Sequence, residues 1–62
     1  MTQKELLYVE DAIGHEKNVS QIVFETIQLL EDKNLQSFMK SELKKHQAIE
    51  NRLMSLLEGE VS

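Results

Sequence analysis

Apolar residues recur along the first half of the chain at alternating spacings of three and four residues. Two positions near the middle of this series are polar; the series runs Leu6, Val9, Ile13, Glu16, Ser20, Val23, Ile27, Leu30. Because an α-helix has 3.6 residues per turn, such a series forms a stripe along one side of a helix. Thr2 and Glu5 have the spacing of a capping box, so we expect this helix to run from about residue 3 to about residue 30.

The stripe does not continue in the same phase into the second half of the chain. Extending it beyond residue 30 leads through polar positions such as Asn34, Ser41 and Lys44. The apolar stripe instead restarts as Leu35, Phe38 or Met39, Glu42, His46, Ile49, Leu53, Leu56. The phase therefore changes within residues 31–34, where Asp32 is a good N-cap for a second helix.

A change of phase over a short turn predicts an all-α fold, an antiparallel helical hairpin. We expect a single domain over residues 1–62, with the turn at about 31–34 and the second helix at about 35–58. Gly59 is then the residue that follows the second helix. The alternative is one long helix with a phase shift at its middle, since neither glycine nor proline occurs in the turn region.

Both helices have apolar arcs wider than one neighbouring helix can cover. A chain of 62 residues buries only about 60% of its unfolded surface, and this one has no cysteine for disulfide bonds. We therefore expect a homodimer in which two hairpins associate into a four-helix bundle. The residues expected to form its core and dimer interface are Leu6, Val9, Ile13, Val23, Ile27, Leu35, Ile49, Leu53 and Leu56.

Four ionisable residues fall inside the apolar arcs: Glu16, Glu42, His46 and Glu50. If the helices pair in antiparallel fashion, Ser20 is level with His46 and Glu16 lies within about one turn of it. One hypothesis is a structural polar layer, in which His46 bonds to Ser20, Glu16 and Glu50 and fixes the register. The other is a metal site for iron, manganese or zinc, built from all four ionisable residues as in di-metal helical bundles. The bundle motif Glu-x-x-His is missing, because Leu43 stands three residues before His46.

The formal charge of −4 and the lack of a basic stripe disfavour a nucleic-acid partner. No apolar run approaches the ~20 residues of a membrane span, and the N-terminal residues do not have the form of a signal peptide. We find no nucleophile–base pair with an orienting third group and no phosphate-binding loop. The sequence therefore predicts a non-enzymatic protein that stays in the cytoplasm of the producing cell.

The segment from Tyr8 to Glu58 resembles the coat F family of bacterial spore-coat proteins. The resemblance is carried by the run DAIGHEK at residues 11–17, by Asp32-x-x-Leu35, and by the run KHQ at residues 45–47. It implies a ferritin-like helical protein with a structural role in the spore or its coat and with helical coat proteins as further partners. Members of that family generally supply four helices from one chain, whereas this chain supplies two, which again favours dimerisation. The resemblance also makes a ferritin-like metal-binding or redox bundle the second functional hypothesis, and an adaptor for another helical protein the third.

Overall fold

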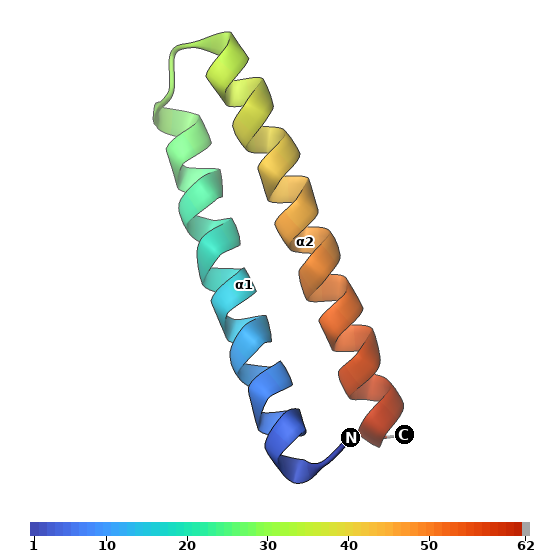
Figure 1. Cartoon of the computed structure of the whole chain (residues 1–62). Helices are drawn as coiled ribbons and strands as arrows, with labels where there is room; N and C mark the ends of the chain where they lie inside the picture. Colours follow the sequence, from blue (N-terminus) through green and yellow to red (C-terminus); the bar gives the residue numbers. More distant parts are fainter. Residues whose placement is uncertain (62) are drawn as a thin grey trace.

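The chain folds into two long α-helices that pack side by side in opposite directions (Figure 1). The computed structural model describes the backbone of residues 1–61 and the side chains of residues 1–59. Helix α1 spans Gln3–Leu29 and helix α2 spans Lys33–Val61. The predicted helical hairpin is therefore confirmed, and the alternative of one long helix is wrong.

Helix α1 begins at the predicted capping box. The Thr2 hydroxyl accepts a hydrogen bond from the Glu5 backbone N–H at 3.1 Å, and the Glu5 carboxylate accepts one from the Thr2 N–H at 2.8 Å. These bonds satisfy backbone donors that a helix N-terminus otherwise leaves without partners. The bond from the Thr2 backbone, followed by that with the Thr2 side chain, lowers the pKa of Glu5 below its usual 4.5.

The turn between the helices is built by Leu30, Asp32 and Gln36. Leu30 is extended, with φ −81° and ψ 137°, and so ends α1 one residue earlier than expected. The Asp32 carboxylate accepts a hydrogen bond from the Leu35 N–H at 3.0 Å, which confirms Asp32 as an N-cap and starts α2 at Lys33 rather than near residue 35. The Gln36 side-chain amide donates to the Leu30 carbonyl at 2.5 Å and ties the first turn of α2 to the end of α1.

The far end of α2 differs from the prediction. The helix continues through Gly59 to Val61, so Gly59 is not its terminating residue. A glycine that ends a helix usually adopts a positive φ, and neither glycine of the chain does. Without that left-handed residue the helical hydrogen-bond ladder simply continues.

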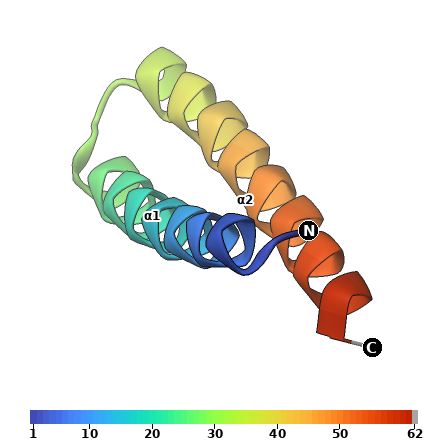
Figure 2. The same cartoon turned by 60° about the horizontal axis from the view of Figure 1, so that its bottom comes forward.

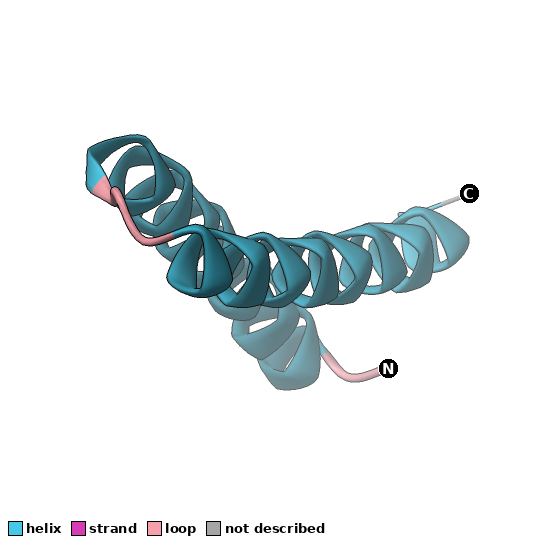
Figure 3. Ribbon diagram, turned by 90° about the horizontal axis from the view of Figure 1, so that it is seen from above, coloured by secondary structure: helices cyan, strands magenta, loops and turns pink. Residues whose placement is uncertain are grey.

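The hairpin is a rod rather than a globule. Its Cα atoms extend over 45 × 14 × 13 Å, with the turn at one end and the N-terminus and the end of α2 at the other (Figures 2 and 3). The two helices are inclined to one another, as the end-on view shows. Among the residues with described side chains, Ile13 alone is buried, at 6% exposure. The core is therefore a single line of contact between the helices.

We call that line the inner seam. On α1 it has the predicted phase, because all eight residues of the predicted series are buried or half-buried. On α2 the most regular half-buried line shares Met39, His46 and Leu53 with the predicted stripe and otherwise lies one position further along the chain. It runs Gln36, Met39, Leu43, His46, Glu50, Leu53, Leu57. Leu35, Ile49 and Leu56, which we expected on the stripe facing α1, are exposed instead.

Candidate functional site

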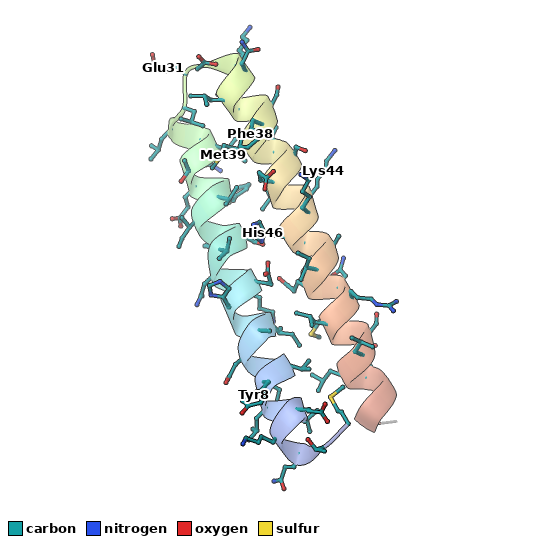
Figure 4. The ribbon with its side chains drawn as sticks, in the orientation of Figure 1. Tyr8, Glu31, Phe38, Met39, Lys44 and His46 are labelled. Carbon is teal, nitrogen blue, oxygen red and sulfur yellow. The ribbon has the colours of Figure 1, made fainter. Side chains whose placement is uncertain are left out.

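The most distinctive side-chain contact joins the middles of the two helices. His46 Nδ1 on α2 lies 2.6 Å from Glu16 Oε2 on α1, and both side chains are largely shielded, at 30% and 14% exposure. In Figure 4 the His46 side chain lies between the helices, whereas Lys44 points outward from α2. This confirms the prediction that Glu16 reaches His46 across the hairpin.

The helical phase explains why these two residues meet. Glu16 follows Ile13 by three positions and precedes Ser20 by four, so it occupies the inner seam of α1. His46 follows Leu43 by three positions in the same way on α2. A carboxylate within a seam needs a partner, and the imidazole provides one at hydrogen-bond distance.

Ser20 lies one turn from Glu16 on the same seam but does not join the contact. Its hydroxyl oxygen is buried and has no hydrogen-bond partner in the structure. The prediction that Ser20 would bond to His46 is therefore wrong. A buried hydroxyl without a partner reduces stability, because it has lost its bond to water and gained none from the protein.

The other two candidate ligands stay apart from the Glu16–His46 pair. Glu42 forms an ion pair with Lys45, one turn further along α2, at 3.2 Å. Glu50 lies on the seam one turn beyond His46, and the structure shows no hydrogen bond between them. Within the part of the chain that the structure describes, no group of three or more possible ligand side chains could hold a metal ion. A metal site from these residues would need ligands from a second chain.

The contact does not have the arrangement of a hydrolytic triad. Serine, histidine and glutamate occur together here, which are the residue types of a hydrolytic triad. The serine hydroxyl is not bonded to the imidazole, however, and residues 1–59 enclose no pocket beside it. The arrangement is that of a half-buried polar contact of the kind that helps to set how two helices align.

A second feature of the molecule is one broad apolar face of the hairpin. The predicted stripes include its residues on α2 but not those on α1. Seven exposed large apolar side chains lie there: Tyr8, Ile22 and Leu29 on α1, and Leu35, Phe38, Ile49 and Leu56 on α2. We call this the exposed apolar face. Its sequence signal is a seven-residue repeat beside the seam, at positions 8, 22 and 29 and at positions 35, 49 and 56, with His15 and Glu42 at the intervening positions.

Comparison with known proteins adds no relative to this picture: no protein-family model matches the chain, and neither a curated protein nor a solved structure does. The resemblance to the coat F family stays a prediction. Neither helix, over the residues that the structure describes, has an apolar stretch long enough to cross a lipid bilayer.

Proposed function

We propose that this chain is a non-enzymatic structural protein that acts by associating with further copies of itself, two hairpins forming a four-helix bundle. The observation that carries the proposal is the amount of surface that the single hairpin leaves uncovered. Its accessible surface is 4914 Å². A compact monomer of the same mass, 7.2 kDa, would expose roughly 4100 Å².

The difference between these two accessible surface areas is close to the area that association normally buries. It amounts to about 800 Å², which is the area that each partner buries in a standard protein–protein interface. The 45 Å length of the hairpin gives a second hairpin a long surface to lie along. A second hairpin laid along that face would cover the surplus.

The nature of the uncovered surface supports the same function. The exposed apolar face carries large side chains at high exposure, 61% for Ile22 and 60% for Phe38. Contiguous apolar patches of this kind on small proteins usually mark interaction surfaces. Polar residues dominate the opposite side of the hairpin. Association through the apolar face would therefore bring two hairpins together and leave their polar sides in contact with solvent.

Sedimentation equilibrium tests the self-association. We expect the wild-type chain to sediment as a dimer or larger assembly at micromolar concentration, and its unfolding midpoint to rise with protein concentration. A monomer at every concentration, with a constant midpoint, would contradict the proposal.

We further propose that this association serves a spore-coat type of structure, which rests on the resemblance over Tyr8–Glu58. The test is a fluorescent fusion of the chain expressed in an endospore-forming bacterium, with the fluorescent protein alone as the control. We expect the fusion to concentrate in the developing spore. An even distribution of both proteins through the mother cell and the spore would remove the spore assignment and leave the self-association standing.

A further inference from the structure

The exposed apolar face spans both helices, and one charged or polar residue, His15 on α1 and Glu42 on α2, interrupts each of its lines. Tyr8, Ile22 and Leu29 are separated by multiples of seven residues, and so are Leu35, Ile49 and Leu56. In helices that coil around each other, seven residues make two turns, so each set forms a line along its helix. On α1 a line of half-buried Ala12, Val19 and Thr26 connects this set to the inner seam.

Both lines lie on the same side of the hairpin. On each helix the line is reached from the inner seam by rotating in the same sense about the helix axis. Because α1 and α2 are antiparallel and face one another, equal rotations lead to the same side of the pair. Of the nine exposed large apolar side chains within the helices, only Leu7 and Phe24 lie off this face. Tyr8 and Phe38, one from each helix, are labelled in Figure 4.

From this face we infer a specific arrangement of the dimer, an inference that rests on the self-association proposed above. We propose that two copies stack through their exposed apolar faces so that α1 of each copy lies along α2 of the other. The two-fold axis then runs parallel to the helices, and every neighbouring pair of helices is antiparallel. The competing arrangement places α1 against the partner's α1 and α2 against the partner's α2.

The alignment of residues across the proposed interface follows from the hairpin itself. Two hydrogen bonds between the arms of the hairpin join Glu16 to His46 and the Leu30 carbonyl to Gln36, so the numbers of level residues sum to between 62 and 66. A two-fold axis parallel to the helices keeps every residue at its own height. The same sums therefore give the facing residues between the two copies.

Side-chain size favours this pairing. The small residues Ala12, Val19 and Thr26 of α1 face the long side chains at positions 52, 45 and 38 of the partner's α2, which are arginine, lysine and phenylalanine. Small residues opposite large ones let neighbouring helices interdigitate evenly. In the competing arrangement the long residues of α2 would meet one another, and the two α2 helices would be held further apart than the two α1 helices.

Charge favours it as well. On α1 the outer edge of the face carries Asp11 and Glu25, and on α2 the face carries Lys45 and Arg52. The proposed pairing brings Asp11 level with Arg52 of the partner subunit, a pair of opposite charges. The competing pairing brings Asp11 level with Glu25 of the partner subunit instead. It would also place Glu42 near the partner's Arg52, but Glu42 already has a cation in its own chain, Lys45 at 3.2 Å.

The first part of the test asks which face associates. A lysine introduced on the exposed apolar face by Ile22→Lys or Ile49→Lys should weaken the dimer at least about tenfold, since it places a charge in an apolar interface. Leu7→Lys is the matched control, because Leu7 is similarly exposed, at 54%, on a different side of α1. We expect it to leave the dissociation constant within about twofold, as exposed substitutions away from an interface usually do.

The second part of the test asks which helices meet in the dimer. Because the sequence contains no cysteine, a single introduced cysteine is the only thiol available for crosslinking. Asn18 and Ala48 are both exposed, and both lie at the outer edge of the exposed apolar face. In the proposed arrangement Asn18 of one copy lies beside Ala48 of the partner subunit. In the competing arrangement each of the two lies beside its own counterpart. The proteins Asn18→Cys and Ala48→Cys are therefore treated with a short thiol-specific crosslinker, separately and as an equimolar mixture.

We expect crosslinked dimers from the mixture and little from either protein alone. Crosslinking of each protein with itself would overturn the proposed arrangement in favour of like helix on like helix. A dimer by sedimentation that is weakened by Leu7→Lys and not by Ile22→Lys would overturn the choice of face, while the self-association would stand. A monomer by sedimentation would overturn both.

Discussion

The inner seam and the exposed apolar face are both stripes along the same two helices, but they differ in exposure and in how their polar residues are paired. At the centre of the seam, Glu16, Ser20, His46 and Glu50 lie within two turns, and Glu16 bonds to His46 across the hairpin. The exposed apolar face carries seven large apolar side chains, with His15, Glu42, Lys45 and Arg52 interspersed among them. The seam is shielded and the face is open to solvent.

The difference separates two tasks. Polar contacts in a seam contribute modestly to stability and strongly disfavour other alignments, because a shifted register leaves charges without partners. An exposed apolar surface stabilises association in proportion to the area that is covered. We therefore propose that the seam sets how the hairpin closes and that the exposed apolar face would drive the addition of a second hairpin.

The largest expected effect comes from the buried residue of the seam, Ile13. Replacing it in Ile13→Ala removes apolar contacts at a site with 6% exposure, and such changes typically cost about 2–5 kcal/mol of unfolding free energy. That is most of the stability of so small a domain. We expect a largely unfolded chain, or a midpoint strongly lowered at every protein concentration, in urea titrations followed by circular dichroism.

Leu7→Ala is the control, because Leu7 is exposed and lies off both the seam and the exposed apolar face. It should change the free energy of unfolding by no more than about 0.5 kcal/mol. If Ile13→Ala unfolds no more readily than Leu7→Ala, the seam is not what holds the hairpin together and the comparison fails.

The second effect concerns the centre of the seam. Glu16→Ala or His46→Ala leaves one polar partner shielded and unpaired, which should lower the free energy of unfolding by about 1–3 kcal/mol. The double variant Glu16→Leu/His46→Leu removes both polar groups and fills their place, so it should recover most of that loss. The measurement is a set of urea titrations on the three proteins and the wild type.

The double leucine variant should recover stability but lose specificity for a single alignment of the two helices. We expect the double leucine variant to form additional oligomers in sedimentation velocity, because its seam no longer penalises shifted alignments. A double variant that is less stable than either single variant would show that the Glu16–His46 contact contributes stability and not alignment.

The comparison also shows what the sequence could predict. The hairpin, the capping box at Thr2 and the meeting of Glu16 with His46 all followed from local rules of spacing and capping. These rules depend on residues a few positions apart, which the sequence displays directly. The phase of α1 was right for the same reason, since its apolar series is unambiguous.

The side of α2 that faces α1 is harder to predict from the sequence, because two adjacent lines on that helix are both apolar. One contains Leu35, Ile49 and Leu56, and the other contains Met39, Leu43 and Leu57. Periodicity cannot decide which of two neighbouring lines turns toward α1, because tertiary packing decides it. Gly59 misled for a different reason: a glycine permits a helix to end but does not compel it.

A smaller effect is expected at Ser20, whose buried hydroxyl lacks a partner. Ser20→Ala removes the unsatisfied group and adds helix propensity, so it should raise the free energy of unfolding by about 1 kcal/mol. For a domain of this size that corresponds to a rise in Tm of about 4–8 °C. A lowered Tm would mean that the hydroxyl is satisfied in solution, and that the seam is more polar than the structure shows.

The smallest effect is local and depends on pH, at the N-terminal end of α1. Hydrogen bonds with Thr2 hold the pKa of Glu5 below its usual 4.5 in the folded chain. A carboxyl whose pKa is lowered by folding stabilises the folded state fully above the unfolded value, and that contribution disappears as the pH falls through the folded value. Amide exchange in the first turn of α1 should therefore speed up as the pH drops below about 4.5, relative to the intrinsic rate for an unstructured chain.

Glu5→Gln is the matched variant, because glutamine keeps the geometry of the capping box but does not titrate. Its first turn should show no such pH-dependent change in protection, while the middle of the helix, around Ile13, behaves alike in both proteins. The exposed apolar face begins beyond this turn, at Tyr8, so fraying here should leave the dimer constant unchanged. A dimer that weakens in step with the fraying would show that the exposed apolar face extends to the first turn of α1 and that the interface uses its whole length.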